Sequence, residues 1–424
     1  MNIWLVTVGE PLPLPGESAR LWRCGLLART LATRSHKVTW WTSTFDHSRK
    51  LPFSRPTKGK DDVVLGGVCL RWLDGIAYRR NLSLRRIVNH VQLGMRFFKL
   101  ARTCNPRPDV IVASFPTIEL AYVASLYARR WNCPLIVDVR DLWPDIFVDA
   151  VPPVLRGPAR LLLSPYFSAT RFLLGAATSV VAVSQKYLDW GIERAGRPTR
   201  STDRVFPLGY EPTTPTEQDR LEIDEVLRQA DEMHIAVFAG SFGRTYDLAT
   251  VIEAARLMDG RGDSSPLFVL CGTGEKEHAL RQLAAGLSNV VFTGLLSAGK
   301  LAAVFERASI GLAAYAVDAP QGIPNKVVEY SCAGLSIMSS LEGETKTLLD
   351  ESGCGLSYAA GNPHDLRRVL VSLLADPAGM ARMRGKASET YRNRFAAIDV
   401  YAAMADHVER VARLDGNGET EKLA

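Results

Sequence analysis

Several common site patterns are absent from this sequence of 424 residues. Its seven cysteines never form a C-x-x-C pair, and no two histidines stand four residues apart. We therefore expect reduced thiols, no disulfide framework and no metal site. Neither half has a G-x-G-x-x-G turn after its first apolar run, and no G-x-x-x-x-G-K-[ST] loop occurs. These absences argue against a nicotinamide cofactor and against P-loop nucleotide hydrolysis, and we expect no cofactor of any kind.

A long uninterrupted apolar run is also missing. The closest is Leu161–Val183, which contains Pro165 and Arg171. An arginine in mid-segment costs roughly 2.5–3.5 kcal/mol on insertion scales, so we expect no transmembrane helix. Met1 leads directly into an apolar strand pattern, and we expect no signal peptide and a cytoplasmic protein. With 47% hydrophobic and 23% charged residues, the composition is typical of a soluble chain of two or three domains.

Charge is distributed unevenly along the chain. Residues 1–206 hold 30 Lys/Arg and 15 Asp/Glu, whereas the remainder has a net charge of −9. This polarity indicates two modules with different partners. A basic module could face nucleic acid, an anionic membrane or phosphate-bearing substrates, or could simply have an arginine-rich surface. No nucleic-acid-binding motif is recognisable, so we expect no nucleic acid partner.

Short apolar runs alternate with helical patterns in both halves of the chain. The predicted strands are Asn2–Val8, Lys37–Thr42, Asp109–Ala113, Leu135–Val139, Ser179–Val183, Ile235–Ala239, Leu267–Cys271, Val290–Thr293, Ile310–Ala314 and Ser336–Ser339. The predicted helices include about 17–33, 247–258, 363–375 and one long helical tail over 377–414. Such alternation predicts an α/β fold with two Rossmann-like, doubly wound parallel sheets. Ligands bind beyond the carboxyl ends of such strands, so we expect the two domains to face each other across a cleft.

The predicted domain boundaries follow the composition. Residues 1–206 form an N-terminal, acceptor-side domain, and the proline-rich range 207–222 is a linker. Residues 223–390 form a nucleotide-sugar-binding domain, and 391–424 form a helical tail that crosses back towards the N-terminal domain. The roles in this division come from the family resemblance given below.

Two segments of the second half favour phosphate binding. Gly240 and Gly243 flank a turn that ends in Arg244, just before a helix. Small residues let the backbone approach a ligand, and arginine pairs with phosphate oxygens. Lys326 stands in the first turn of another predicted helix, with Asn325 near its N-cap. A cation there opposes the helix dipole unless an anion lies beside it. Alternatively, the first segment is a tight connection and the second carries a solvated Lys326–Glu329 pair.

The chain resembles the retaining family 4 glycosyltransferases of GT-B fold, and within them bacterial O-antigen and capsule enzymes of the fucosamine-transferase type. The resemblance runs in order through Glu10–Lys50, Asp138–Pro144, Gly240–Asp247, Asn289–Gly294 and Ile323–Gly334. It implies that Arg244 and Lys326 contact the donor diphosphate and act in catalysis. It further implies donor-binding positions at Gly16, Gly240, Gly243, Gly272, Gly274 and Glu329, the last of which holds the ribose. The acceptor side would include Arg140 and Asp141.

Three positions depart from the family pattern. Gln321 stands where the first acid of the E-x7-E element is usual, so a carboxylate contact to the transferred sugar is in doubt. The lysine usual soon after the arginine is replaced by the run Thr245-Tyr246-Asp247. Arg140 precedes Asp141 where many members have histidine, and an arginine cannot accept a proton. Arg140 could bind a phosphate or acceptor, or form an ion pair with Asp141 or Asp145.

The resemblance therefore implies a metal-independent transferase that moves a sugar from a nucleotide diphosphate to a saccharide on polyprenyl diphosphate. We expect the nucleotide to be UDP. Two alternatives stay open, namely a nucleotide-sugar epimerase and a non-catalytic nucleotide-binding scaffold. Residues 82–100 form an amphipathic basic helix, which would place the enzyme peripherally on the inner face of the plasma membrane. The hydrophobic, arginine-bearing stretch 155–174 could do the same. Packing of the helix on the sheet with extended arginines is the alternative interpretation.

Overall fold

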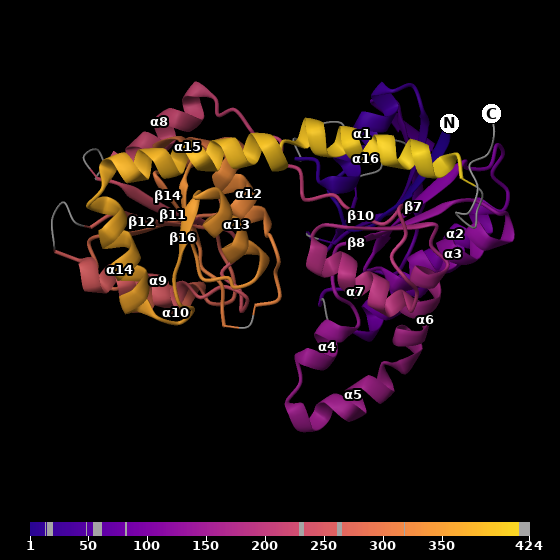
Figure 1. The fold of residues 1–424 in the computed structure, drawn as a ribbon, viewed down its shortest axis with the longest axis horizontal. Coiled ribbons are helices and arrows are strands. Elements are labelled where there is room, and N and C mark those ends of the chain that lie inside the picture. The colour runs from indigo at the N-terminus through magenta and orange to yellow at the C-terminus, as the bar shows by residue number, and fades with distance from the viewer. Residues whose placement is uncertain are drawn as a thin grey trace. The chain divides into compact units, whose positions relative to one another are not determined.

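The computed structural model describes residues 1–12, 14, 20–47, 49–53, 62–80, 83–228, 233–260, 265–317 and 319–414. The chain divides into two compact units (Figure 1). Unit 1 consists of Met1–Pro207 and Asp399–Ala424, and unit 2 consists of Leu208–Ile398. Each unit contains a parallel sheet covered by helices, which confirms the predicted α/β class with two doubly wound domains.

Unit 1 is built on a sheet whose eight described strands are parallel except at one edge. In spatial order they are β10 (Arg204–Val205), β9 (Ser179–Ala182), β8 (Leu135–Val139), β7 (Val110–Phe115), β1 (Asn2–Val6), β2 (Lys37–Ser43), β6 (Val68–Leu73) and the antiparallel β5 (Asp62–Leu65). A separate short ribbon pairs β3 (Phe45–Asp46) with β4 (Leu51–Pro52). Because β1 lies between β2 and β7, the strand order reverses there, and ligands bind at such a switch point.

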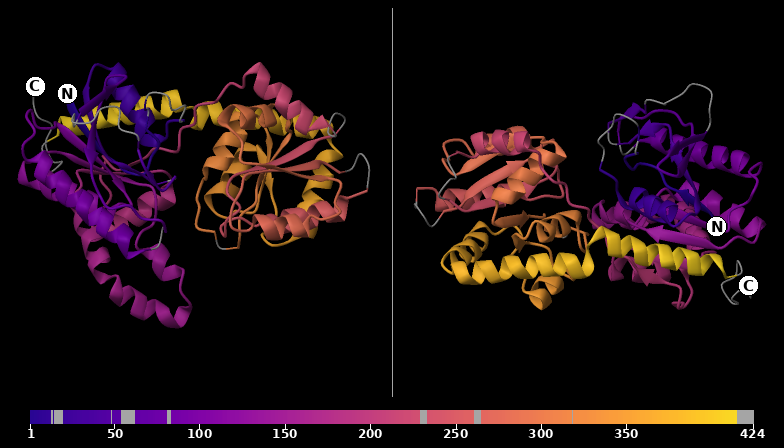
Figure 2. Two further views of the ribbon diagram at one scale, coloured as in Figure 1. Left: turned by 180° about the vertical axis from the view of Figure 1, so that it is seen from behind. Right: turned by 90° about the horizontal axis from the view of Figure 1, so that it is seen from above.

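Most helices of unit 1 bury residues in its core, whereas two short ones, Pro153–Leu155 and Arg156–Leu162, bury none. The helices are α1 (Arg23–Thr33), α2 (Leu84–Ala101), α3 (Ile118–Arg130), α4 (Asp145–Asp149), η1 (Pro153–Leu155), α5 (Arg156–Leu162), α6 (Ser164–Gly175), α7 (Gln185–Ala195) and α16 (Ala397–Ala412). Helix α2 begins after Ser83, whose hydroxyl accepts a hydrogen bond from the Arg86 amide. It buries Leu93 and Phe97 and exposes Leu84 and Met95. Two views show α4 and α5 as an arm that projects from the rest of unit 1 (Figures 1 and 2).

Unit 2 contains a sheet of six described strands, all parallel. Their order is β13 (Val290–Gly294), β12 (Leu267–Cys271), β11 (Ile235–Ala239), β14 (Ile310–Ala313), β15 (Ser336–Ser339) and β16 (Gly355–Ser357). The helices are α8 (Glu217–Val226), α9 (Leu248–Met258), α10 (Glu277–Leu283), α11 (Ala298–Arg307), α12 (Asn325–Cys332), α13 (Glu344–Ser352), α14 (Pro363–Leu374) and α15 (Pro377–Arg394). The central strands are buried on both faces, which explains their unbroken apolar runs.

Two predicted segments differ from the structure. Helix α8 begins at Glu217, inside the range 207–222 that was predicted to be a linker. The last proline of that range is Pro215, and Thr216 after it forms a capping box with Asp219. The expectation of one helix over 377–414 is wrong. Helix α15 ends at Arg394, and α16 begins at Ala397. At the break, the Tyr210 amide donates a hydrogen bond to Phe395 O, and the Tyr210 carbonyl accepts one from the Ala397 amide. These two bonds replace hydrogen bonds of a continuous helix.

Helix α16 is held in unit 1 by a buried histidine. His407 Nε2 lies 2.9 Å from Ser179 Oγ, and its Nδ1 accepts from Arg410 at 2.8 Å. Its ring lies against Phe206, with centroids 5.3 Å apart. Burial and the nearby charges of Arg410 and Arg204 lower the pKa of His407 to about 4. None of the helices in the described ranges combines the length and apolar character needed to cross a bilayer.

We expect His407 to make unit 1 sensitive to mild acid. Its pKa lies below the ordinary value of 6.5, so the unfolded chain binds the extra proton between pH 6.5 and about 4. Stability is therefore retained above pH 6.5 and falls as the pH drops towards 5, by about 2 kcal/mol from this group. Urea unfolding at pH 7 and 5 should show a smaller loss in His407→Gln than in the wild type. The exposed His278→Gln serves as control, and an equal effect of both variants would contradict the account.

Candidate functional site

Two glycine turns at the carboxyl ends of β11 and β12 pack directly on each other. The Gly240 amide donates to Cys271 O at 2.9 Å, and the Phe242 amide donates to Thr273 O at 2.8 Å. A side chain at Gly272 would overlap the Gly240 carbonyl, and one at Gly274 would overlap the Phe242 backbone. Gly240 and Gly272 also have φ of 149° and 144°, which favour glycine. Three predicted donor-binding glycines are thus adjacent because two chain segments meet without room for side chains.

Lys326 lies immediately beneath the first of these turns. It is the second residue of α12, whose N-cap is Pro324 rather than Asn325, and only 6% of it is exposed. Its ammonium donates to Ala239 O and lies 4.3 Å and 4.5 Å from the ring centroids of Phe238 and Tyr246. A side chain at Gly240 would overlap this ammonium.

The electrostatic environment of Lys326 is unfavourable to its charge. Burial lowers the pKa of Lys326 to about 8, although the nearby Glu329 carboxylate favours the charged form. The ammonium also stands in the first turn of a helix, where the backbone dipole repels a cation. An anion placed at the Gly240 turn would relieve both effects. Lys326 therefore has the surroundings of a cation prepared for an anionic ligand.

Arg244 lies on the same turn but in water. Its side chain is 90% exposed, and its Nε lies 3.3 Å from Glu275 Oε1. At the residue before it, Gly243, a Cβ would make only an ordinary contact with the Ser241 hydroxyl, at 3.7 Å. The structure thus brings Arg244 and Lys326 to one edge of the unit 2 sheet, the first exposed to solvent and the second buried below the backbone. An exposed ion pair such as Arg244–Glu275 is weak and can be exchanged for a phosphate.

Glu329, predicted to hold the ribose, lies within α12, and Gln321, which replaces the first acid of the E-x7-E element, lies on the segment that leads into this helix. Glu329 is half-buried one turn after Lys326. The side-chain Oε1 of Gln321 is buried and has no hydrogen-bond partner among the described residues. A buried amide oxygen without a partner is costly and is satisfied when a ligand hydroxyl donates to it. Gly16, also predicted to bind the donor, falls outside the described residues.

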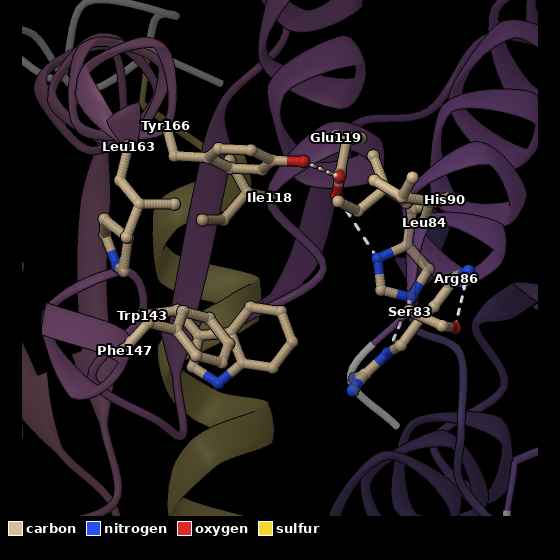
Figure 3. Close-up of a pocket in the computed structure, with 12 residues that line it drawn as sticks. Ser83, Leu84, Arg86, His90, Ile118, Glu119, Trp143, Phe147, Leu163 and Tyr166 are labelled. Carbon is tan, nitrogen blue, oxygen red and sulfur yellow. Dashed lines mark hydrogen bonds and ion pairs between the residues drawn. The ribbon is translucent and has the colours of Figure 1, made fainter. Parts of the chain in front are cut away.

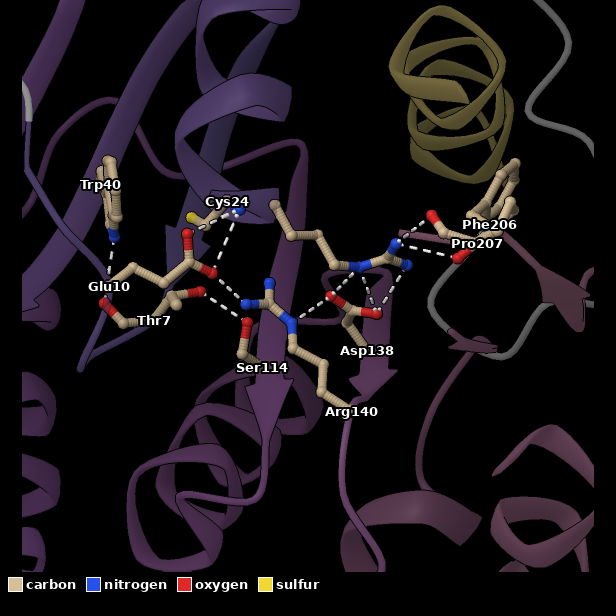
Figure 4. A network of polar contacts seen from close by, with 10 residues as sticks. Thr7, Glu10, Cys24, Trp40, Ser114, Asp138, Arg140, Phe206 and Pro207 are labelled. Carbon is tan, nitrogen blue, oxygen red and sulfur yellow. Dashed lines mark hydrogen bonds and ion pairs between the residues drawn. The ribbon is translucent and has the colours of Figure 1, made fainter. Parts of the chain in front are cut away.

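Arg140 lies in a buried ionic network at the carboxyl end of β8 (Figure 4). Its Nε donates to Asp138 Oδ2 at 2.7 Å, and another nitrogen pairs with Glu10. The expected ion pair with Asp141 or Asp145 is therefore wrong. Asp145 instead pairs with Arg194 at 2.7 Å. Side chains two residues apart along a strand point to the same side of the sheet, so Arg140 pairs with Asp138 and not with Asp141.

The same network reaches Phe206 and Pro207, where the first of the two chain segments of unit 1 ends. Asp138 accepts three further bonds from Arg23, which also donates to the carbonyls of Phe206 at 2.8 Å and Pro207 at 3.0 Å. Burial raises the pKa of Asp138, but Arg23 and Arg140 outweigh it, and the net shift is downwards. Glu10 accepts from the Cys24 amide at 2.9 Å. Asp138 thus joins the loop after β1 to the last residues of unit 1.

Asp141, the other predicted acceptor-side residue, stands outside this network. Its Oδ1 accepts from the Leu142 amide at 2.8 Å. Burial raises the pKa of its carboxyl, partly offset by that hydrogen bond and by the charge of Arg86. Sequence reasoning missed the partners Glu10, Arg23 and Asp138. They come from three separate segments, and the only signal was the polar Asp138 inside an apolar strand run. No cluster of three metal-binding side chains occurs among the described residues.

Comparisons with known proteins agree with this geometry. Residues 22–209 match the family described as Glycosyl transferase 4-like domain, and residues 234–376 match Glycosyl transferases group 1. No curated protein matches the sequence. The first match spans most of unit 1 and the second most of unit 2, and together they cover more than three quarters of the chain. The chain therefore belongs to the group 1 glycosyltransferases of GT-B fold.

Solved structures support the same fold at low sequence identity. Sucrose-phosphate synthase from Thermosynechococcus elongatus is 17% identical, with a TM-score of 0.71 over 96% of this chain and 97% of that one. HepE from Anabaena, in complex with UDP-glucose, is 16% identical, with a TM-score of 0.64 over 96% and 99%. WaaG, a glycosyltransferase involved in lipopolysaccharide biosynthesis, is 15% identical, with a TM-score of 0.63 over 96% and 99%.

We predict that Asp138→Ala destabilises unit 1 by about 3–5 kcal/mol, because it leaves the buried Arg23 uncompensated and removes one partner of Arg140. The measurement is the free energy of unfolding from urea titration. Glu225→Ala is a matched control, since it removes a carboxylate from an exposed pair with Arg228. That variant should change stability by less than about 0.5 kcal/mol. Equal effects of the two variants would refute the structural importance of the network.

Proposed function

We propose that this glycosyltransferase moves a sugar from a UDP donor to a saccharide carried on polyprenyl diphosphate, with retention of anomeric configuration and without a metal ion. The pathway would be O-antigen or capsule biosynthesis at the cytoplasmic face of the plasma membrane. The observation that carries the proposal is Lys326, a cation buried under the Gly240 turn next to backbone that can approach a ligand closely.

The chemistry follows from where charge develops. When the bond between sugar and diphosphate breaks, negative charge appears on the leaving oxygens. Cations fixed at that position stabilise the transition state more than the substrate. Lys326 supplies a charge already removed from water, so no reorganisation is needed at the moment of reaction. Arg244 is exposed and can exchange Glu275 for a phosphate oxygen. These two cations replace the charge that a metal would otherwise provide.

Retention is consistent with this arrangement. With positive groups around the leaving diphosphate, that group can take the proton of the incoming hydroxyl on the face from which it departs. The Arg140 guanidinium is paired with Asp138 and Glu10 and is always protonated, so we assign it a positioning role. The unpartnered Gln321 oxygen would accept a hydrogen bond from the donor sugar. Glu329 would hold the ribose, as the family resemblance implies.

The choice of donor and acceptor rests on weaker similarity. HepE was solved with UDP-glucose, and this chain shares its fold, which favours a uridine donor. The resemblance to fucosamine transferases makes UDP-N-acetylfucosamine the first sugar to test. On the acceptor side, α2 and α5 of unit 1 expose apolar residues among arginines, which suits a lipid-linked substrate.

We expect Lys326→Met to lower kcat for sugar transfer by about 100- to 1000-fold, the cost of losing one preorganised stabilising group. The assay follows UDP release and determines the product linkage by NMR. Lys346→Met, which removes a lysine paired with Glu342 on the surface of unit 2, should leave the rate unchanged.

Three outcomes would contradict the proposal. Equal rates in Lys326→Met and the wild type would exclude the role of the buried cation. UDP binding with no turnover on any lipid-linked acceptor would favour the scaffold. A changed donor sugar without an acceptor would indicate an epimerase.

We further predict reversible binding to anionic vesicles through the arm of unit 1. Leu161 and Leu162 of α5 are 76% and 80% exposed, near Arg156 and Arg160. Co-flotation with phosphatidylglycerol vesicles should be lost in Leu161→Glu/Leu162→Glu. The double variant Leu295→Glu/Val317→Glu, equally exposed on unit 2, should still float. No flotation of the wild type at low salt would refute membrane attachment.

A further inference from the structure

Unit 1 contains an apolar cavity that the sequence patterns did not indicate. It has a volume of about 360 Å³ and is enclosed by α2, α3, α4 and the start of α6 (Figure 3). Most of its wall is hydrocarbon, from residues that include Leu84, Ile87, Ile118, Trp143, Phe147 and Leu163. Its size falls within the range of about 300–1,000 Å³ usual for ligand pockets.

The polar end of this cavity has a defined structure. Arg86 lies over the Trp143 ring at 4.8 Å, and its Nε donates to His90 Nε2 at 3.4 Å. His90 Nδ1 lies 3.3 Å from Glu119 Oε2, and Tyr166 donates to the other oxygen of that carboxylate at 2.8 Å. Figure 3 shows Tyr166, Glu119, His90 and Arg86 in sequence along the top and right of the view, with Trp143 below them. The Glu119 carboxylate thus has His90 and Tyr166 as polar neighbours, while the Arg86 guanidinium lies over the Trp143 ring and donates to His90.

A second, smaller cavity adjoins the first and shares Arg86 and His90 with it. It has a volume of about 130 Å³ and lies where strands end. Its lining includes Gly9 after β1, Ser43 at the end of β2 and Thr117 after β7. This is the carboxyl edge of the unit 1 sheet, at the switch point where ligands bind in such folds. The larger cavity is hydrocarbon-lined, whereas the smaller one, called the polar cavity below, has a greater share of polar groups on a mainly apolar wall.

Positive groups gather around the polar cavity. Lys50 Nζ lies 3.4 Å from His47 Nδ1 and 5.2 Å from the Tyr78 ring. Burial, followed by the charges of Lys50 and Arg86, lowers the pKa of His47 to about 4. Burial and the charge of Arg86 also lower the pKa of Lys50, although Asp46 opposes this. Burial is the largest cause of both pKa shifts and the neighbouring cations are the next, and an anion bound here would offset the effect of the cations.

We propose that the two cavities form one binding site for a polyprenyl diphosphate, with the first isoprene units in the apolar cavity and the diphosphate facing Arg86 and Lys50. The inference rests on the proposed function, since it assigns the lipid part of the acceptor. Charge complementarity selects the occupant. A hydrocarbon chain alone would have no anionic group to contact Arg86 and Lys50, and a free phosphate would leave the apolar cavity empty. The exposed Leu84 at the rim continues towards the apolar surface of α2.

The test is calorimetric titration of the whole protein with farnesyl diphosphate and, separately, with inorganic pyrophosphate. The wild type should bind farnesyl diphosphate at least tenfold more tightly than pyrophosphate. Ile87→Glu places a charge in the apolar cavity and should remove that difference. Val91→Glu is the matched control, because both residues are 41% exposed on α2 and Val91 does not line the cavity. Arg86→Gln should weaken both ligands at least tenfold.

UDP affinity separates this inference from the proposed function. It should be unchanged in Ile87→Glu and Arg86→Gln, because the proposed donor site lies in unit 2. The inference is overturned if farnesyl diphosphate binds no better than pyrophosphate, or if Ile87→Glu and Val91→Glu behave alike. Sugar transfer to a lipid-linked acceptor that is unaffected by Ile87→Glu would also overturn it, while leaving the proposed function intact. Farnesyl diphosphate binding without any sugar transfer would contradict the proposed function and leave this inference intact.

Discussion

A protonated amine held away from water is the interaction on which unit 2 depends. Lys326 fills the space beneath the turn after β11, donates to Ala239 O and faces two aromatic rings. Its position requires glycine at 240, because any side chain there would overlap the ammonium. The close approach of the next turn requires glycine at 272 in the same way. The backbone at these two positions carries no side chain because the ammonium occupies the Cβ space at 240 and the neighbouring backbone occupies it at 272.

Unit 1 uses buried charge differently. Asp138 lies between Arg23 and Arg140, and the three connect the loop after β1 with the carbonyls of Phe206 and Pro207. Such a network gives little net stability compared with apolar packing, but it fixes geometry, because breaking it leaves charges without partners. Unit 2 keeps a cation whose best partner would be a ligand, whereas the Asp138 network of unit 1 pairs its charges with one another and holds segments in place.

The sequence was sufficient to predict those strands and helices whose pattern lies within one short segment of the chain. Strands such as Leu135–Val139 and Ile235–Ala239 were predicted with their observed bounds, since a strand buried on both faces is an unbroken apolar run. Strand β6 was missed because its alternating burial and Arg71 resemble a surface segment. The break after Arg394 was missed because Tyr210, distant in sequence, replaces the helical bonds. The Glu10–Arg140 pair was unpredictable for the same reason, since contacts between remote segments leave no local pattern.

The most direct test of the central claim is proton uptake on UDP binding, measured by calorimetry at pH 8 in buffers of different ionisation enthalpy. The pKa of Lys326 is about 8, so half of the free protein carries the proton at that pH. A diphosphate beside it would raise that pKa and draw in about half a proton per UDP bound, fading towards pH 6.5. Uptake should vanish in Lys326→Met. UDP binding at pH 8 without proton uptake, or with equal uptake in that variant, would contradict the account.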